Sequence, residues 1–463
     1  MRFAWLMMLA AITSGSALWC APADKSLPNV LLITVDTLRA DHLSCYGYGR
    51  NTSPYIDGLA RDGSRFSRAY TSIPLTGPAH LSLFTGRYPQ ENGVRRNGVA
   101  PPDERALVTL PQILRGHGYQ TGAFISSWPL LGRLTHLDRY FSSYDENLTR
   151  SYQIFNSSRY AEDVTPPALK WLHKHANKKK PFFLWVHYFD PHEPYVFRAD
   201  FDPPKVDKAH PDEPPQDNDM RERVRSYDSE IYYTDHNIGK LLQALDDMHV
   251  KDSTMVVLVA DHGESLGQHD YVGHGRHVYE GIIHIPFIVR YPGHVKAGQV
   301  IDTPVSIIDV TPTIVDLSVK NVVAAKKKVP IVFSGRSLAP SLENGKNPTD
   351  RWIYYVTFPG KKGYAPQWLS WMWVKNEELP LRFGRIDDFS KMTWDPTEKK
   401  LSLYDLRSDP DENHPRVIAD SNPTYEADTS ELKKWFSRTE TRAAEKKLSA
   451  HDEEVLKSLG YVQ

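Results

Sequence analysis

Residues 72–89 bring together a hydroxyl and an imidazole in a pattern that suits nucleophilic chemistry. The stretch reads SIPLTGPAHLSLFTGRYP, and Thr76 and His80 are four residues apart, on one face of any helix that spans them. Pro78 is typical of a helical first turn and Gly86 of a helix end. Thr76 is therefore expected at a helix N-terminus, where free backbone N–H groups favour an anion. A hydroxyl in that position, with a cation nearby, could attack a tetrahedral oxyanion ester covalently.

The same stretch has a plainer interpretation. Thr76 could be an N-cap, a common place for threonine, and His80 a partly buried residue of the helix. The choice between the two depends on whether other reactive side chains converge on the same place.

Polar side chains follow three strongly apolar runs of the chain. The runs are 30–35, 181–186 and 254–260, and the polar residues after them are Asp36, then His187, Asp190 and His192, then Asp261 and His262. Parallel strands place their carboxyl ends at one edge of a sheet, so these residues should converge near the helix that begins at Thr76. Two carboxylates and a histidine are a suitable divalent-metal site, completed by an oxygen of the nucleophile or substrate.

Strands and helices alternate along the chain up to about residue 320. Further strands are expected at 66–70, 120–126 and 286–290, and helices at 53–60, 110–117, 166–175 and 221–248, with 130–159 irregular. Continuous apolar runs are typical of parallel strands that are buried on both faces. The predicted fold is therefore α/β, a mostly parallel sheet covered by helices on both faces.

The sequence changes in character near residue 330. Residues 24–329 are predicted to form a catalytic α/β domain, and 330–463 a smaller C-terminal α+β subdomain. In the subdomain we expect a small antiparallel sheet and a helix, with strands at 352–358, 368–375 and 401–406 and the helix at 424–445.

The first 23 residues, MRFAWLMMLAAITSGSALWCAPA, are predicted to be a secretory signal peptide. Their apolar run is too short to span a bilayer, and Ala21 and Ala23 supply the small residues of a cleavage site. Lipoprotein anchoring at Cys20 is the alternative, although the residues before it are larger than that modification prefers. The mature chain is expected to be secreted or periplasmic, without an integral membrane segment.

The charge balance and the cysteine content exclude several classes of partner and of metal site. Lys and Arg number 56 against 57 Asp and Glu, and this balance argues against a nucleic-acid partner or a basic membrane-binding surface. After signal-peptide removal only Cys45 remains, which excludes an internal disulfide and a cysteine-based zinc site.

Short motifs are spread over the whole chain after residue 28. They are 29–36 (NVLLITVD), 76–87 (TGPAHLSLFTGR), 191–194 (PHEP), 261–264 (DHGE), 273–275 (GHG), 286–292 (PFIVRYP), 306–312 (SIIDVTP), 335–338 (GRSL) and 403–410 (LYDLRSDP). Taken together they resemble the sulfatase family of the alkaline phosphatase superfamily. The resemblance implies an alkaline-phosphatase-like fold and the activity of an ester hydrolase.

The threonine motif departs from that family at the position that defines sulfatase chemistry. Family sulfatases carry Cys-x-Pro-x-Arg or Ser-x-Pro-x-Arg, whose first residue is oxidised to formylglycine. Here Thr76 stands at that position and His80 at the arginine. No formylglycine is expected, and the resemblance implies an unmodified threonine nucleophile, as in phosphodiesterase, phosphonate hydrolase and phosphoethanolamine transferase relatives.

The metal motifs depart as well. Family sulfatases have paired aspartates after the first strand and Asp-Asn after the later one, whereas this chain has Asp36-Thr37 and Asp261-His262. Loss of an oxygen ligand and gain of an imidazole move the preference from Ca²⁺ toward Zn²⁺, Mn²⁺ or Fe. The pattern is similar to that of phosphonate monoester hydrolases and implies one divalent ion on the two aspartates, His262 and Thr76.

The same resemblance implies roles for the surrounding polar residues. Asn97 and Asp190 would bind substrate, His80 would stabilise the equatorial oxygens, and His192 or His274 would protonate the leaving group.

A second metal is a further possibility at the same strand ends. Asp190, His187 and His277 could supply it. Strand-end hydrogen bonding and loop packing are the alternative roles for these three residues.

The leading prediction is a secreted, metal-dependent hydrolase that cleaves phosphate, phosphonate or sulfate esters through a covalent Thr76 intermediate. The expected partner is a small-molecule, glycan or lipid-headgroup ester. Alternatives are a true sulfatase with an unmodified threonine, a phospho-headgroup transferase, and a non-catalytic glycan or headgroup binder. Transferase relatives usually carry membrane helices, and a binder need not keep a stoichiometric metal.

Overall fold

The computed structural model describes residues 27–101, 107–152, 155–176, 179–205, 217–323, 332–349, 351–358 and 380–437. The predicted signal peptide with Cys20, and the predicted strand 368–375, lie outside the described residues. Within the described ranges, no helix combines the length and the apolar character that a bilayer crossing requires.

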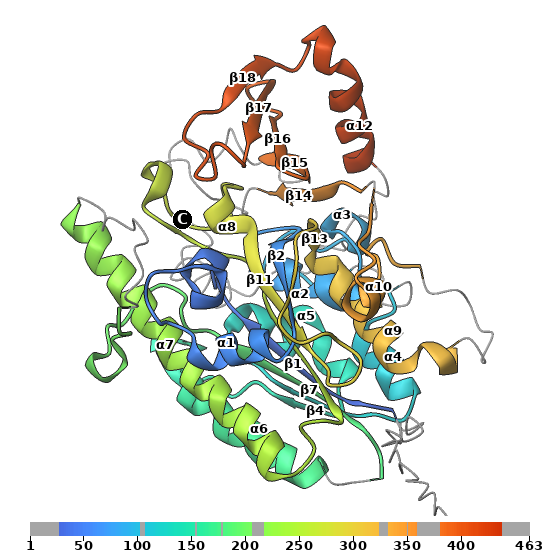
Figure 1. The fold of residues 1–463 in the computed structure, drawn as a ribbon. Helices are drawn as coiled ribbons and strands as arrows, with labels where there is room; N and C mark the ends of the chain where they lie inside the picture. The colour runs from blue at the N-terminus through green and yellow to red at the C-terminus, as the bar shows by residue number, and fades with distance from the viewer. Residues whose placement is uncertain are drawn as a thin grey trace, which may run out of the picture.

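A nine-stranded sheet forms the centre of the molecule (Figure 1). Eight strands follow the order β12-β2-β11-β8-β1-β7-β3-β4, and β13 pairs with β2. Their bounds are β1 Asn29–Val35, β2 Ser64–Tyr70, β3 Gln120–Phe124, β4 Ser143–Asp145, β7 Phe182–Tyr188, β8 Thr254–Ala260, β11 His284–Arg290, β12 Gln299–Ile301 and β13 Val305–Ser306. Only β11 runs antiparallel to its neighbours β2 and β8, so the predicted mostly parallel sheet is confirmed.

The three central strands end at the same level. In the pairing of β1 with its neighbours, Val35 lies opposite Tyr188 of β7 and Ala260 of β8. All residues of these three strands are buried, as their continuous apolar sequences require. The polar residues that follow each strand therefore emerge side by side at one sheet edge.

Helices cover both faces of the sheet, as predicted (Figure 1). One face carries α1 Pro54–Arg61, α6 Ala161–His175 and α7 Asn218–Asp247, and the other carries α2 Thr76–Thr85, α4 Leu110–Gly116 and α9 Val310–Val323, with α10 Ala339–Asn344 nearby. The start predicted for α6 at residue 166 is wrong, because Pro166 and Pro167 lie inside the helix and the acidic first turn begins at Ala161. Shorter elements are α3 Pro89–Asn92, α5 Gly132–Thr135, α8 Glu280–Ile283, β9 Ser265–Leu266 and β10 Val272–Gly273.

Residues 130–159 are not irregular, contrary to the prediction. They contain the edge strand β4 and the hairpin of β5 Arg150–Tyr152 with β6 Phe155–Ser158. These strands are only three or four residues long and carry many polar side chains, so they lack the apolar alternation from which strands are recognised.

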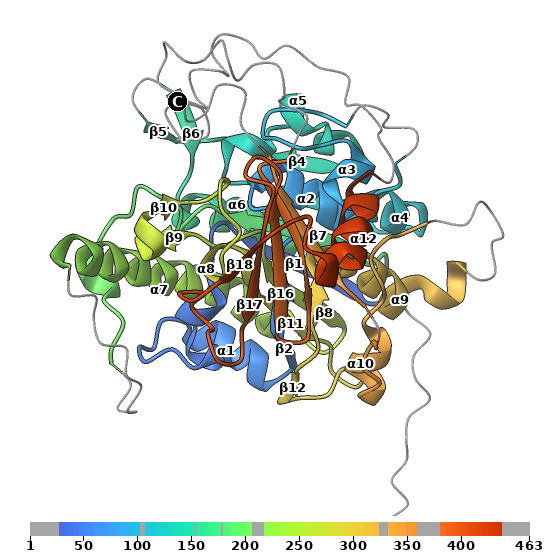
Figure 2. The ribbon, with the colours of Figure 1, turned by 90° about the horizontal axis from the view of Figure 1, so that it is seen from above.

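A five-stranded antiparallel sheet lies over the edge of the central sheet (Figures 1 and 2). It consists of β14 Ile353–Thr357, β15 Arg382–Asp387, β16 Ser390–Asp395, β17 Lys400–Asp405 and β18 Arg416–Ala419, and α12 Glu426–Ser437 packs beside it. This is the small antiparallel sheet and helix expected at the C-terminal end. Val356 N donates a hydrogen bond to Ser72 O at 2.9 Å, so β14 is tied directly to the segment that leads into α2.

Candidate active site

Thr76 is the first residue of α2, and it is fully buried. Leu75 occupies the N-cap position, so the interpretation of Thr76 as an N-cap is wrong. The helix ends at Gly86, whose φ of 61° is left-handed, as the sequence predicts. Thr76 O lies 2.7 Å from His80 Nδ1, which in turn lies 3.6 Å from Asp261 Oδ2, so the helix starts close to the sheet edge where the polar residues emerge.

Asp36, Asp261 and His262 converge at that edge, as predicted. The three residues offer ligand atoms within 4.8 Å of one another, and all are completely buried. His262 Nε2 lies 3.6 Å from both Asp36 Oδ1 and Asp261 Oδ2. Bonds from Zn²⁺ to nitrogen and oxygen are about 2.0–2.2 Å, so two ligands of one tetrahedral ion lie about 3.3–3.6 Å apart. The spacing in the cluster fits a shared divalent ion.

The pKa shifts and the unpaired polar atoms of the cluster are also consistent with a bound cation. Burial, with the neighbouring carboxylates of Asp261 and Glu264, holds the pKa of Asp36 well above its usual range. Burial raises the pKa of Asp261 to about 8 and lowers the pKa of His262 to about 3. Both Asp36 oxygens, Asp261 Oδ2 and His262 Nε2 make no hydrogen bond of normal geometry with the described residues. Buried polar atoms of this kind are costly unless a ligand engages them, and a divalent cation would do so.

Neighbouring groups orient the cluster. Asp261 Oδ1 accepts hydrogen bonds from His262 N at 2.8 Å and Thr37 N at 3.3 Å. His262 Nδ1 lies 3.0 Å from Gly263 O and donates to it in the neutral ring, which leaves Nε2 as the available ligand atom. The remaining carboxylate oxygen and ring nitrogen therefore face the same point.

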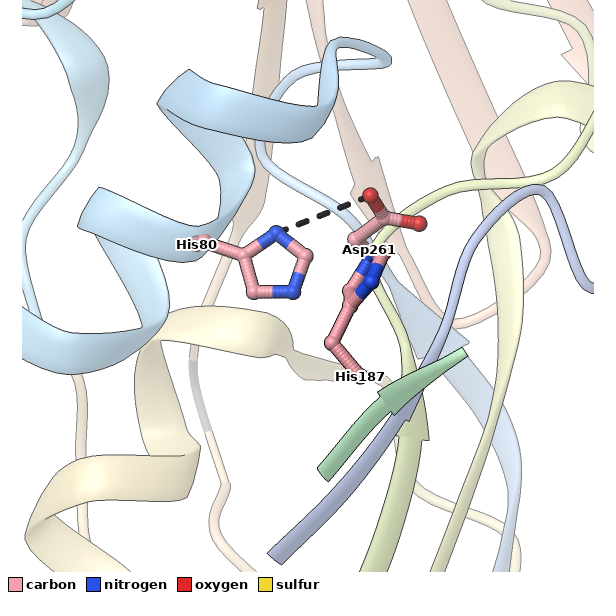
Figure 3. Close-up of side chains that lie close together, drawn as sticks. All are labelled: His80, His187 and Asp261. Atoms are coloured by element: carbon pink, nitrogen blue, oxygen red, sulfur yellow. Dashed lines mark ion pairs between the residues drawn. The ribbon is translucent and has the colours of Figure 1, made fainter. Parts of the chain in front are cut away.

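His80 connects the helix to the metal cluster (Figure 3). Its Nδ1 lies 2.7 Å from Thr76 O and 3.6 Å from Asp261 Oδ2, and its Nε2 lies 3.1 Å from Thr34 Oγ1. Burial lowers the pKa of His80 to about 4. The ring is neutral at pH 7, so it does not provide the cation that the sequence places beside Thr76.

Two further imidazoles, those of His192 and His274, lie next to His262 of the cluster. The His274 ring lies 4.3 Å from that of His262 and 5.1 Å from that of His192, centroid to centroid. Burial lowers the pKa of His192 to about 4 and holds that of His274 well below its usual range. An anion bound between them would raise both pKa values, because an opposite charge favours the imidazolium. The two candidate acids are thus brought together at one place.

Asn97 contacts the N-terminus of α2. Its Oδ1 accepts a hydrogen bond from Gly77 N at 2.7 Å, and its buried Nδ2 has no partner among the described residues. The oxygen is fixed by the helix, so the amide donor is available for an oxygen next to Thr76. This arrangement supports the predicted contact of Asn97 with substrate.

Asp190 lies in a different environment from the other strand-end residues. Its Oδ2 accepts a hydrogen bond from Ala161 N at 2.9 Å, which caps the N-terminus of α6. Burial raises its pKa to about 6, against the effect of Arg198 and Arg150. This is the strand-end hydrogen bonding given above as the alternative to its other roles.

The set considered for a second metal does not come together. His187 lies in the cluster, with Nε2 3.7 Å from Asp36 Oδ2, whereas Asp190 caps α6. His277 Nδ1 instead lies 3.3 Å from an Arg382 nitrogen, and the ring packs against Tyr271 and Tyr279.

Two residues that contribute to the site, Thr34 and Glu264, were not predicted from the sequence. Thr34 Oγ1 accepts a hydrogen bond from Trp185 Nε1 at 2.9 Å and contacts His80, so these residues fix the imidazole. The signal for Thr34 was present, since it is the only polar residue in the apolar run 30–35. Glu264 is buried, accepts a hydrogen bond from Tyr195 Oη at 2.6 Å, and has a pKa raised to about 8 by burial. It lies in the 261–264 motif, to which no role for this residue was attached.

Family comparisons agree with this geometry. The sulfatase family model matches residues 28–319, and the model of the N-sulphoglucosamine sulphohydrolase C-terminal region matches 267–442. The chain therefore belongs to the sulfatase family, and it is a hydrolase of sulfuric or phosphoric esters.

Similar proteins include both sulfatases and phosphonate hydrolases. The uncharacterized sulfatase YidJ of Escherichia coli is 26% identical over 84% of this chain and 82% of its own. An N-acetylglucosamine-6-O-sulfatase of Bacteroides thetaiotaomicron is 24% identical over 88% of this chain and 86% of its own. The crystal structure of a phosphonate monoester hydrolase of Agrobacterium radiobacter aligns with a TM-score of 0.66 and 21% identity, covering 88% of this chain and 94% of that one. It shows that the fold is shared.

Proposed function

We propose that the protein is a metal-dependent hydrolase that cleaves phosphate or phosphonate esters through a covalent bond to Thr76. The observation that carries this proposal is the buried set of unpaired ligand atoms on Asp36, Asp261 and His262, next to the helix that begins with an unmodified threonine. Family membership gives the ester chemistry, and the residue at the helix start selects the form of the nucleophile.

The donor set suits one divalent ion. We infer that the two aspartates, His262 and the Thr76 hydroxyl hold Zn²⁺, Mn²⁺, Fe or Ca²⁺, with the imidazole favouring the transition metals. A bound ion would lower the pKa of the Thr76 hydroxyl and neutralise charge that develops on the ester oxygens.

The residues of the chain would carry the reaction in two steps. Thr76 Oγ loses its proton to solvent and forms a bond to phosphorus as the bond to the leaving oxygen breaks, and the protonated His192 or His274 gives that oxygen a proton. Water then attacks phosphorus and gives one proton back to the histidine, the bond to Oγ breaks, and Thr76 regains its proton from solvent. Asn97 Nδ2 would donate a hydrogen bond to an equatorial oxygen, because its Oδ1 already accepts from Gly77 N and only the amide N–H groups remain.

His80 would support these steps by holding the helix start. Its contacts with Thr76 O, Thr34 and Asp261 fix the first turn of α2 against the metal ligands. We propose that it contributes in this way, because its ring nitrogens are engaged by Thr76 O and Thr34 Oγ1 and leave no donor for the equatorial oxygens.

The ester could belong to a glycan, a lipid headgroup or a smaller molecule. One structural neighbour is titled as Ps i-CgsB in complex with k-i-k-neocarrahexaose, and another as a complex with D-glucosamine-2-N,6-O-disulfate. We propose an export signal in residues 1–23 and a secreted or periplasmic location on the strength of the sequence. The proposed division into a catalytic domain at 24–329 and a C-terminal subdomain at 330–463 likewise rests on sequence character.

Replacement of the nucleophile tests the covalent step. Thr76→Ala should lower kcat against a nitrophenyl phosphonate by at least about 10⁴-fold, as expected for loss of a nucleophile. Its metal content should remain stoichiometric, because Asp36, Asp261 and His262 stay in place and water can take the position of the hydroxyl. Thr76→Ser keeps a hydroxyl and should retain measurable turnover. Rapid acid quenching followed by peptide mass spectrometry should find phosphate or phosphonate on Thr76, and full activity of the alanine variant would contradict the proposal.

A sulfatase with an unmodified threonine is the second candidate, supported by the sulfatases among the relatives. Nitrophenyl sulfate, phosphate, phosphodiester and phosphonate substrates, assayed side by side, separate the two candidates directly. Turnover of sulfate alone would favour the second.

A further inference from the structure

The polar cluster extends beyond the residues assigned to the first cation. His80, His187 and Asp261 offer one ligand atom each within 4.8 Å of one another, and all three side chains are buried. They come from α2, from the end of β7 and from the end of β8, and the two rings face the carboxylate (Figure 3). Only Asp261 is common to this set and to the set of Asp36, Asp261 and His262.

His187 is the most unusual member. Its side chain is completely buried, and neither ring nitrogen has a hydrogen-bond partner among the described residues. A second nearly buried histidine, His42, shows the usual arrangement, with Nδ1 2.8 Å from Asp228 Oδ1. A buried imidazole without a partner costs stability unless a ligand satisfies it. Its Nε2 faces Asp36 Oδ2 at 3.7 Å, a separation close to that of two ligands of one ion.

Asp36 faces a histidine with each of its oxygens. Oδ1 lies 3.6 Å from His262 Nε2, and Oδ2 lies 3.7 Å from His187 Nε2. Neither oxygen makes a hydrogen bond of normal geometry with the described residues. A carboxylate with one imidazole at each oxygen can bridge two cations, and paired ions in hydrolases lie about 3.5–4 Å apart.

His80 can serve as a ligand in one of its two neutral forms. Thr34 Oγ1 has two lone pairs, so it can accept from Trp185 Nε1 at 2.9 Å and from His80 Nε2 at 3.1 Å. In that tautomer Nδ1 is unprotonated, and it lies 3.6 Å from Asp261 Oδ2. In the other tautomer Nδ1 donates to Thr76 O. A cation on Nδ1 would select the first form and replace the hydrogen bond to Thr76 O, so the carbonyl oxygen would have to move away from the ring.

We propose that His80, His187 and Asp261, with the Oδ2 atom of Asp36, bind a second divalent cation beside the first. Two imidazoles with carboxylate oxygens favour Zn²⁺, Mn²⁺ or Fe²⁺ over Ca²⁺. This site deepens the proposed function and rests on it, because Asp36 and Asp261 also serve the first cation. Its effect would be additional positive charge near the start of α2, where the ester oxygens would bind.

Metal counting tests the second site. The full-length protein is stripped with a chelator, loaded with Zn²⁺, desalted and analysed by plasma mass spectrometry. Wild type should hold two ions per chain, and His187→Gln should hold one. The matched control is His117→Gln, because His117 sits on the α4 C-cap with Nδ1 2.7 Å from Ile113 O, outside the two clusters. That variant should hold two.

A second measurement can be made on the wild type alone and then repeated on the variant. With Mn²⁺ loaded, two ions this close should give the electron paramagnetic resonance spectrum of a coupled pair, and His187→Gln should give an isolated-ion spectrum. A wild type with one ion overturns the second site and leaves the proposed function standing. A wild type with none overturns both. Two ions retained by a folded His187→Gln also overturn the proposal.

Discussion

Two buried charge clusters in this protein are built in opposite ways. In the first, the ion-pair contacts of Asp36 and Asp261 within the described residues are all with histidines. In the second, Lys391 of β16 places its Nζ 2.8 Å from Glu412 and 3.1 Å from Glu280, and donates to Val278 O at 2.7 Å. The C-terminal sheet thus brings its own cation to its carboxylates.

The difference shows in the titration of the carboxylates. Burial raises the pKa of Glu412 to about 7, and the charge of Lys391 opposes that rise. At the sheet edge burial raises the pKa of Asp261 to about 8, and only backbone hydrogen bonds oppose that rise. Lys391 balances the negative charge of the carboxylates in the C-terminal cluster. The neutral histidines of the sheet-edge cluster cannot balance the charge of its aspartates, so that cluster needs a cation from outside. The incomplete cluster is the one beside the candidate nucleophile.

The largest effect is expected when the sheet-edge cluster loses a ligand. Asp261→Asn should abolish stoichiometric metal and lower kcat/KM by at least about 10³-fold, because a catalytic metal supplies several kcal/mol of charge stabilisation. Asp261 touches both His80 and His262, so no other residue can replace it. Metal analysis and ester turnover on the same preparation check this, and unchanged metal content would show that the cluster is not the site.

A substitution in the Lys391 cluster should lower the stability of the protein without affecting metal binding or turnover. Glu412→Gln removes one partner of Lys391 and should destabilise the protein by about 3 kcal/mol, at the lower end for a broken buried pair because Glu280 remains. Metal content and kcat per folded molecule should stay at the wild-type level. Chemical denaturation and metal analysis together test the contrast, which fails if this variant also loses metal.

A smaller effect is expected at Asn97. Asn97→Ala removes the Nδ2 donor and the acceptor for Gly77 N, and should lower kcat by about 10–100-fold, in line with loss of one or two hydrogen bonds of about 1–3 kcal/mol. Asn97→Asp keeps the acceptor and loses the donor. If the donor contacts the substrate, both variants should be slow, and a fully active aspartate variant would restrict Asn97 to a structural role.

The smallest effect concerns pH and the metal-free protein. The folded-state pKa of Asp261, about 8, lies above the unfolded value, so the folded state binds an extra proton between pH 6.5 and 8. Stability must then fall as pH rises through that window, by about 1 kcal/mol per pH unit for one proton. The window lies above the range in which the buried histidines titrate.

Thermal unfolding of chelator-treated protein between pH 6.5 and 8 measures this slope. Asp261→Asn should make the slope shallower by the share of one proton, while Glu264, whose pKa is also raised to about 8, keeps part of it. Bound metal should remove the share of Asp261, since ligation requires the ionised carboxylate. An equal slope in wild type and variant would assign the effect to other groups.

Most of the metal-binding residues could be predicted from the sequence, because they follow the most regular strands of the fold. β8 has the predicted bounds, and β1 and β7 differ by one or two residues, since continuous apolar runs between polar residues admit few other structures. With those strands parallel, the convergence of Asp36, Asp261 and His262 was a geometric consequence.

What sequence could not resolve was the direction in which neighbouring side chains point. His187 and Asp190 are three residues apart and were grouped together, but His187 faces the cluster and Asp190 caps α6. His277 was equally hard to place, because its contact with Arg382 joins the segment between β10 and α8 to β15, far away in the chain. Such contacts depend on tertiary packing, and neither periodicity nor motif spacing contains them.

The central claim is that the unpaired ligand atoms at the sheet edge bind a divalent cation. Anomalous diffraction from crystals of the Zn²⁺-loaded protein, collected on both sides of the zinc absorption edge, tests it most directly. The account predicts a strong peak within about 2.0–2.2 Å of ligand atoms from Asp36, Asp261 and His262. A map with no peak among these three residues, from a protein that hydrolyses ester in the same preparation, would contradict it.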